Sequence, residues 1–440
     1  MIRTYDRKLV LPDGTEYYGY AFGGDPGAAA ADGSFRGAAA ADSAALPGCS
    51  LLELVFNTSM AGYQEILSDP SYTGQAVVMS YPLIGNYGMA EEDYESDALR
   101  PGALIVREYN PRPSNFRSIS SLGDVMRKQG VPGLWGIDTR SLVRRLRTDG
   151  SMMAAVAPAA FPLKEILPVL REARPRTDTV PSVSISRPQF IPAEGPLFSE
   201  DPTSPAGPVP PEAPKFHIAV IDCGIKRNIL REMHRLCPRS LIGGASPGFE
   251  GLQSFSDRRS FRLCPRSVIG GADLTVLPWN TTAEQIRALK PDGVFISNGP
   301  GDPADVPETE ETIRNLIGTV PVFGICLGHQ LIARAMGADT YKLHFGHRGG
   351  NHPVKNLLTG KVEITSQNHS FAVDEATLPG TGLAVTHRNL LDNTVEGLAC
   401  PERSVFCVQY HPESCPGPQD SSYLFLEFFR MMQERSSPGH

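Results

Sequence analysis

Gly324-Ile-Cys-Leu-Gly-His-Gln330 is the stretch that decides how the C-terminal half of this chain folds. An apolar run that ends at Phe323 predicts a buried strand, and residues 330–336 predict a helix. Cys326 lies on the turn between these two elements. Because the glycines on either side add no bulk, the turn can be sharp enough to lift the thiol above the sheet edge, where the helix N-terminus favours a thiolate. The stretch therefore predicts a nucleophilic cysteine.

A base for this thiol is predicted far downstream, in Tyr410-His-Pro-Glu413. Residues 405–410 predict a strand, which places His411 at its end. Residues two apart in an extended segment face the same side, so Glu413 can accept from one ring nitrogen while the other faces Cys326. Taken singly, Cys326 is more typical of a buried small residue and His411 of a turn histidine. The two motifs together favour a Cys-His-Glu triad, in which the carboxylate fixes the tautomer and stabilises the imidazolium.

Residues 215–435 alternate between patterns typical of strands and of helices, which predicts an α/β domain. Strands are expected at 217–221, 274–277 and 293–297, and helices at 228–234, 283–289 and 307–317. This alternation predicts a doubly wound, mostly parallel sheet flanked by helices, with functional loops at the carboxyl ends of the strands.

One such loop is Asn298-Gly-Pro-Gly-Asp-Pro303, which follows a predicted strand. Its glycines, Gly299 and Gly301, can present backbone N–H groups to an anion with no side chain in the way. Standing alone, the loop is equally typical of an ordinary Gly-Pro turn. Next to a nucleophilic cysteine it indicates part of an oxyanion hole.

The chain is divided near its middle by residues 186–214, which hold nine prolines and cannot sustain a helix or a central strand. We interpret this segment as a linker between a separate N-terminal α/β domain, 1–185, and the C-terminal domain. Residues 23–48 repeat Gly-Ala-Ala-Ala-Ala-Asp and form a low-complexity insertion. Residues 235–245 reappear almost unchanged at 262–272, which we interpret as a lengthened surface loop.

Composition excludes several classes of protein. The formal net charge of -7 and the pI of about 5.8, without a Lys/Arg stripe interleaved with aromatic residues, argue against nucleic-acid binding. Residues 1–12 lack an apolar signal core, and no window reaches the roughly 18 apolar residues that a membrane span needs. We therefore expect a cytoplasmic protein whose eight cysteines are reduced.

Two further polar segments invite a binding function. His344, His347 and His352 suggest a metal, but they lie in a predicted Gly-rich loop without a nearby cysteine or carboxylate at ligand spacing, so we predict no metal site. Thr365-Ser-Gln-Asn-His-Ser-Phe371 predicts a strand that runs into a polar turn. Its amides and backbone could bind the amino and carboxylate groups of an amino acid.

The cysteine turn, the Gly-Pro-Gly-Asp-Pro loop, the Gln-Asn-His segment and the His-Pro-Glu strand resemble those of class I (triad) glutamine amidotransferases. The N-terminal half is similar to the small-subunit pattern of carbamoyl-phosphate synthase. The segments that carry this second resemblance are Phe56-Asn-Thr-Ser-Met-Ala-Gly-Tyr-Gln-Glu65, Asp69-Pro-Ser-Tyr72, Ser80-Tyr-Pro-Leu-Ile-Gly-Asn86 and Gly136-Ile-Asp-Thr-Arg140.

The resemblance implies hydrolysis of L-glutamine through a γ-glutamyl thioester on Cys326. Ammonia would pass through an internal tunnel to a large synthetase subunit, which makes carbamoyl phosphate from bicarbonate and ATP. No cofactor is expected in this subunit, whereas ATP and Mg are expected on the large one. The resemblance also implies a heterodimer or a higher-order hetero-oligomer, and arginine or pyrimidine biosynthesis as the pathway.

By the same resemblance, the backbone N–H groups of Gly299 and Leu327 would hold the oxyanion. The ends of the substrate would be held by Ser71, Gly301, Gln330, Asn368, Ser370 and Phe371. Ser71 belongs to the N-terminal half, so the pocket would straddle two domains. Position 370 departs from the family pattern, which has glycine there, and a positive φ would strain Ser370 by about 1 kcal/mol.

Three other functions remain open on the sequence. Another class I amidotransferase subunit, such as that of anthranilate synthase, would keep the triad but leave residues 1–185 unexplained. A stand-alone hydrolase would cleave γ-glutamyl substrates without a partner. A non-catalytic interaction subunit is disfavoured because Cys326, His411 and Glu413 are all present.

Overall fold

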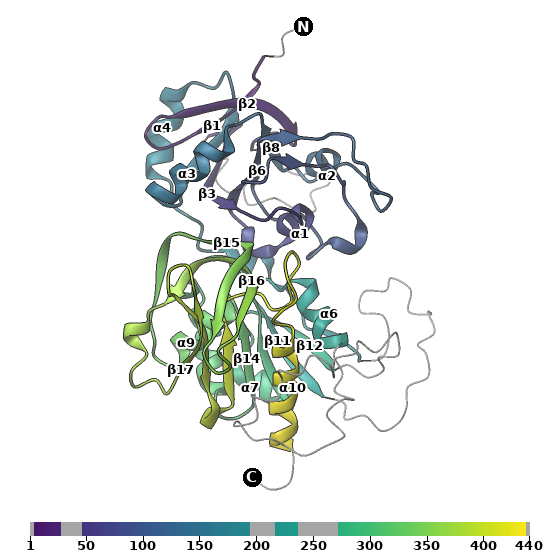
Figure 1. The fold of residues 1–440 in the computed structure, drawn as a ribbon, viewed down its shortest axis with the longest axis vertical. Helices are drawn as coiled ribbons and strands as arrows, with labels where there is room; N and C mark the ends of the chain where they lie inside the picture. Colours follow the sequence, from purple (N-terminus) through teal and green to yellow (C-terminus); the bar gives the residue numbers. More distant parts are fainter. Residues whose placement is uncertain (1–3, 28–45, 194–215, 236–271, 437–440) are drawn as a thin grey trace.

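The computed structural model describes residues 4–27, 46–193, 216–235 and 272–436. Most of the predicted linker, the low-complexity insertion and the duplicated segment lie outside these ranges. The described residues form two parts, an N-terminal barrel and a C-terminal sheet covered by helices (Figure 1). Among them, no helix combines the length and the hydrophobicity needed to cross a membrane.

The N-terminal part is a closed seven-stranded barrel in the order β1-β2-β8-β6-β4-β3-β9. Its strands are β1 Arg7–Val10, β2 Glu16–Gly23, β3 Ser50–Asn57, β4 Gln75–Met79, β6 Ala103–Val106, β8 Pro132–Trp135 and β9 Met152–Pro158. A short pair, β5 Leu83–Ile84 and β7 Glu108–Tyr109, lies apart from it. The helices are α1 Tyr63–Ser68, α2 Leu122–Lys128, α3 Thr139–Asp149, α4 Leu163–Glu172 and α5 Thr179–Val183.

The C-terminal part is a ten-stranded sheet in the order β10-β12-β11-β13-β14-β19-β18-β17-β15-β16. Its strands are β10 Gln189–Ile191, β11 His217–Asp222, β12 Asp273–Pro278, β13 Gly293–Ile296, β14 Val322–Ile325, β15 Thr340–Asn356, β16 Val362–Val373, β17 Ala384–Asn389, β18 Val395–Cys400 and β19 Val405–Val408. Strands β12, β11, β13, β14 and β19 are parallel, and the remaining pairs are antiparallel.

Helices cover both faces of this sheet. They are α6 Arg227–Arg235, α7 Ala283–Ala288, α8 Pro307–Leu316, α9 Leu327–Ala335 and α10 Tyr423–Ser436. Successive residues of a strand point to opposite faces, so in β13 Val294 packs into the core under α7, α8 and α9, whereas Phe295 packs with α6 and α10. The predicted doubly wound α/β fold with a separate N-terminal domain is confirmed.

Three local predictions differ from the structure. Helix α9 begins at Leu327, directly after the cysteine, and not at residue 330. The histidine segment predicted as a Gly-rich loop is the long strand β15, and the polar turn predicted near residue 371 is the interior of β16. The two strands pair with irregularities, one of them at Gly346, whose φ is 71°. Glycine-containing bulges of this kind hide the period of two by which a strand is normally recognised.

The first residues of the predicted linker also have a defined place. Gln189–Ile191 forms β10, which adds an antiparallel edge strand next to β12. Pro188 and Pro192 flank it, as expected for proline, which is confined to the ends and edges of sheets.

The two parts contact each other through polar groups. Lys342 donates to Glu53 Oε1 at 2.6 Å, and Asn368 donates to Asp69 Oδ2 at 2.9 Å. The backbone N–H of Thr58 donates to the carbonyl of Arg348 at 3.2 Å. Strands β15 and β16 therefore lie against the barrel (Figure 1).

Phe323 gives a direct test of the core beneath the cysteine turn. Its side chain is fully buried, stacks on Phe406 with 4.3 Å between ring centroids, and meets Phe425 edge-on. We expect Phe323→Ala to lower the free energy of unfolding by about 3–5 kcal/mol, because it removes buried area and leaves a cavity. Phe190→Ala is the matched control, because Phe190 is 61% exposed and the change should fall within about 0.5 kcal/mol. Urea unfolding measures both variants, and an equal decrease in the free energy of unfolding for Phe323→Ala and Phe190→Ala would contradict this account.

Candidate active site

Cys326 occupies a strained position between β14 and α9. Its φ of 55° and ψ of -104° are unfavourable for a residue with a side chain. Its N–H donates to Val408 O at 2.9 Å, which ties the turn to β19. A Cβ at Gly324 or Gly328 would overlap Ile332 or the carbonyl of Ile296. The two glycines thus let α9 pack directly on the sheet and hold the thiol at the strand end.

The imidazole of His411 lies between Glu413 and Cys326. Its Nδ1 is 2.6 Å from Glu413 Oε1, and its backbone N–H donates to Ser366 O at 2.9 Å. The other ring nitrogen, Nε2, is buried and has no hydrogen-bond partner among the described residues. The Cys326 side chain adjoins this imidazole and acts on its charge. The structure therefore brings together the three residues of the predicted triad.

Charges around the triad favour an imidazolium. Burial lowers the pKa of His411, but the charge of Glu413, followed by Cys326, outweighs burial and raises the pKa well above its ordinary value. Burial likewise raises the pKa of Glu413, and the charges of Lys226 and His411 reverse this and lower it. The arrangement suits transfer of the thiol proton to the imidazole.

Lys226 is a part of the site that the sequence analysis missed. Its side chain is 2% exposed, and its Nζ donates to Glu413 Oε1 at 2.9 Å and to Ser414 O at 2.7 Å. The sequence did contain a signal for this residue. Lys226 follows β11, and the loops at the carboxyl ends of parallel strands are where functional residues are expected.

A cavity of about 330 Å³ opens beside Cys326. Both domains line it, whereas His411 and Glu413 lie outside its lining. Every residue expected to bind substrate is on its wall, namely Ser71, Gly299, Gly301, Leu327, Gln330, Asn368, Ser370 and Phe371. The sequence analysis did not assign six charged wall residues to the site, namely Glu53, Arg176, Asp302, Asp305, Lys342 and Arg348.

The wall is built from direct contacts between distant segments. Asn298 Nδ2 donates to Ser71 Oγ at 3.0 Å, and Gln330 Nε2 donates to Phe371 O at 2.8 Å. The Cys326 thiol lies 3.5 Å from Asn368 O, so β16 passes directly over the nucleophile. A Cβ at Gly299 would overlap the carbonyl of Cys223, and Gly301 has a φ of 91°, so both loop positions require glycine.

Ser370 is accommodated without the strain that a positive φ would have caused. It lies within β16 and is absent from the residues with positive φ. Its Oγ accepts a hydrogen bond from Nη2 of Arg348, a residue that is 3% exposed. The serine therefore pairs with a buried cation of the cavity wall.

Comparisons with known proteins agree with this geometry. The family model described as glutamine amidotransferase class-I matches residues 260–431, and that of the carbamoyl-phosphate synthase small chain, CPSase domain, matches residues 9–156. The fold and the cysteine site thus define a class I glutamine amidotransferase domain, joined here to a second domain.

Relatives identify the combination of the two domains. A carbamoyl phosphate synthase small chain from Listeria innocua is 44% identical over 380 residues, 86% of this chain and 90% of the relative. One from Fusobacterium nucleatum is 41% identical over 426 residues, 97% of this chain and 98% of the relative. The chain belongs to the carbamoyl-phosphate synthase small-chain family. An anthranilate synthase type of subunit is therefore excluded.

A solved structure from Thermoplasma acidophilum, described as part of a putative GMP synthase, aligns with 51% of this chain and 97% of its own. At 18% identity and a TM-score of 0.38, the likeness adds nothing to the assignment.

Glu413→Gln tests the electrostatic account of the site. Without the carboxylate charge, Cys326 is the main remaining group that opposes burial, so we expect the pKa of His411 to fall toward the ordinary value of about 6.5 and the ring to be mostly neutral at pH 7. Histidine-selective ¹⁵N NMR titration measures this. Glu363→Gln, at another buried glutamate that contacts Ser421 and Tyr423, should leave the His411 titration unchanged. A His411 pKa that stays raised in Glu413→Gln would refute the account.

Proposed function

We propose that this chain hydrolyses L-glutamine with the triad Cys326, His411 and Glu413 and supplies ammonia to a large carbamoyl-phosphate synthase subunit. The observation that carries the proposal is the buried imidazole of His411, bonded to Glu413 at 2.6 Å and adjoining a thiol that faces a cavity of amino-acid size. Family membership supports the same substrate, because the family model is that of a glutamine amidotransferase.

The first half of the reaction forms a thioester. Nε2 of His411 takes the thiol proton, and the sulfur of Cys326 attacks the side-chain amide carbon of glutamine. Backbone N–H groups of Gly299 and Leu327 stabilise the oxyanion, by about 3 kcal/mol for each donor. The N–H of Leu327 is free for this because the first N–H groups of a helix have no partner within it. The intermediate collapses to the γ-glutamyl thioester as the imidazolium gives its proton to the departing ammonia.

The second half of the reaction restores the enzyme. Water, deprotonated by His411, attacks the thioester carbon, and the thiolate leaves and recovers its proton, which releases glutamate. Glu413, itself held ionised by Lys226, keeps Nδ1 protonated throughout. Ser71, Gly301, Gln330, Asn368, Ser370 and Phe371 hold the amino and carboxylate ends of the substrate.

The ammonia then serves a partner. We propose that it travels through an internal tunnel to a large synthetase subunit, which binds ATP and Mg and makes carbamoyl phosphate from bicarbonate. The two subunits form a heterodimer or a higher-order hetero-oligomer in the cytoplasm and feed arginine or pyrimidine biosynthesis. This chain needs no cofactor of its own for the glutaminase step.

Cys326→Ser separates catalysis from scaffolding. We expect the rate of glutamine hydrolysis to fall by about a thousandfold or more, because a serine hydroxyl is far less acidic than a thiol. With the large subunit present, carbamoyl phosphate synthesis from added ammonia should persist. Cys400→Ser, which replaces a buried cysteine outside the cavity lining, should keep the wild-type rate. Wild-type glutamine hydrolysis by Cys326→Ser would refute the mechanism.

The partner is tested by reconstitution. We expect weak glutaminase activity of the chain alone, and a rise on addition of a large carbamoyl-phosphate synthase subunit with ATP and bicarbonate. Release of glutamate is the measurement, and large subunit without nucleotide is the control. High activity of the chain alone that no synthetase alters would instead favour a stand-alone hydrolase.

A further inference from the structure

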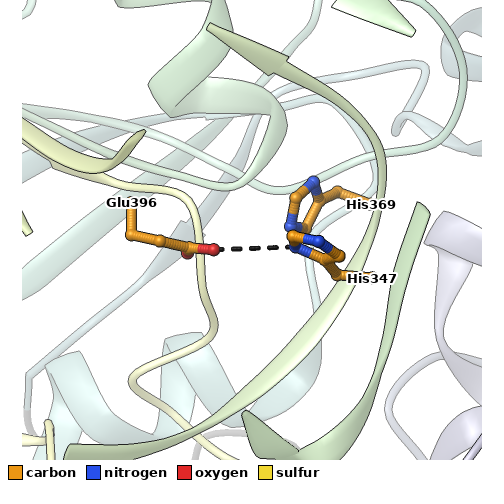
Figure 2. Close-up of side chains that lie close together, drawn as sticks. All are labelled: His347, His369 and Glu396. Carbon is orange, nitrogen blue, oxygen red and sulfur yellow. Dashed lines mark ion pairs between the residues drawn. The ribbon is translucent and has the colours of Figure 1, made fainter. Parts of the chain in front are cut away.

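A second cluster of ionisable side chains lies inside the antiparallel part of the C-terminal sheet. It consists of His347 on β15, His369 on β16 and Glu396 on β18, which are 5%, 5% and 0% exposed (Figure 2). Strands far apart in sequence thus place a carboxylate beside His347. The expectation that this histidine segment has no carboxylate nearby is wrong in space, although it is correct along the sequence.

Each histidine of the cluster has one nitrogen already bonded to an oxygen acceptor. Nε2 of His347 donates to Asp392 Oδ2 at 2.7 Å, and Nδ1 of His369 donates to Phe371 O at 2.7 Å. These bonds place the protons and leave His347 Nδ1 and His369 Nε2 with lone pairs. Hydrogen bonds of this kind orient the histidines of metal sites and fix their tautomers.

The remaining nitrogens turn inward and are poorly satisfied. His347 Nδ1 is buried and has no hydrogen-bond partner among the described residues, and it lies 3.7 Å from Glu396 Oε1. Figure 2 shows the carboxylate pointing at the two rings, which lie close together. His369 Nε2 lies 3.0 Å from Gln367 Oε1. Because the proton of this ring is on Nδ1, both of these atoms are hydrogen-bond acceptors, and a cation or a further proton between them would relieve their repulsion.

We propose that His347, His369 and Glu396 bind a zinc ion. Their ligand atoms all lie within 4.8 Å of one another, and the 3.7 Å separation is close to the edge of about 3.3 Å that tetrahedral zinc with bonds near 2.0–2.1 Å requires. Two neutral imidazoles and one carboxylate are ligands that zinc accepts. Glu396 is held in place by Asn389 at 2.8 Å and by Gln367 at 2.9 Å.

The ion would act on the neighbouring glutamine cavity through the backbone. His369 itself lines the cavity, as do its neighbours Asn368 and Ser370, and Asn368 O contacts the Cys326 thiol. Zinc would fix this part of β16 by joining it to β15 and β18. The role is structural, because the ligands are buried and the reacting thiol is not among them.

A proton is the competing occupant of the same gap. Burial lowers the pKa of His347, but the hydrogen bond to Asp392 and the nearby negative charges of Glu396 and Asp392 outweigh burial and raise the pKa to about 9. An imidazolium at position 347 would therefore satisfy Glu396 without any metal. The experiment must distinguish zinc from this proton and from zinc on the Cys326 thiolate.

The test uses the full-length chain carrying Cys326→Ser, so that the triad thiol cannot bind metal. We expect about one zinc per chain after dialysis, measured by elemental analysis, and a melting temperature that rises with added zinc. Cobalt in place of zinc should give the visible absorption of a tetrahedral site. Adding Glu396→Gln should weaken zinc binding at least tenfold in competition with a chromophoric chelator. His344→Gln, at an exposed histidine of the same strand, should leave it unchanged.

Three results would overturn the proposal. They are no zinc retained by the Cys326→Ser chain, equal zinc affinity with and without Glu396→Gln, and zinc present only when Cys326 is intact. The first leaves the proton as the sole occupant, and the last assigns the metal to the thiol. If Glu396→Gln fails to fold, Asp392→Asn takes its place. This change weakens the hydrogen bond by which Asp392 orients the imidazole of His347, and its loss should weaken zinc binding by about 10–100-fold.

Discussion

The proposed active site depends on keeping a carboxylate ionised inside the protein. Glu413 is buried, and an unpaired buried charge is strongly unfavourable. Lys226 and His411 both pair with its Oε1, so the lysine charge offsets that of the carboxylate and the carboxylate in turn stabilises the imidazolium. Without Lys226, the carboxylate of Glu413 would have only the imidazolium of His411 as a buried partner. Transfer of the proton from the imidazolium to the carboxylate would then be favoured, because it leaves both groups neutral. In the proposed triad, the capacity of His411 to act as a base therefore depends on Lys226, which bonds to the carboxylate.

The cysteine turn imposes a second constraint, which is steric. Cys326 keeps a backbone conformation that is unfavourable for an isolated residue, and neighbouring contacts stabilise it. Val408 accepts the cysteine N–H, and the absence of Cβ atoms at Gly324 and Gly328 lets α9 approach the sheet. The strand, the turn and the helix therefore form one unit, and the conformation of the nucleophile is fixed before any substrate enters.

Much of this could be predicted from the sequence, because its signals are local. Each strand or helix of the C-terminal alternation, the cysteine turn and the His-x-Glu spacing occupies a short stretch of sequence, so periodicity and turn chemistry reveal them. Long-range features could not be read in this way. Lys226 reaches Glu413 across 187 positions. Bulges disguised β15 as a loop and the later part of β16 as a turn, and the neighbours of His347 become apparent only once β18 is placed.

Both domains contribute residues to the cavity wall. Cys326 belongs to the C-terminal domain, whereas Glu53, Ser71 and Gln75 belong to the N-terminal domain. The hydrogen bonds from Asn298 to Ser71 and from Asn368 to Asp69 join the two domains, and each includes one residue of the wall, Ser71 or Asn368. A rigid rotation of the barrel against the sheet would change the shape of the chamber without moving the sulfur relative to its base. Hinge motion between the halves could thus regulate access for substrate while the chemical machinery stays assembled.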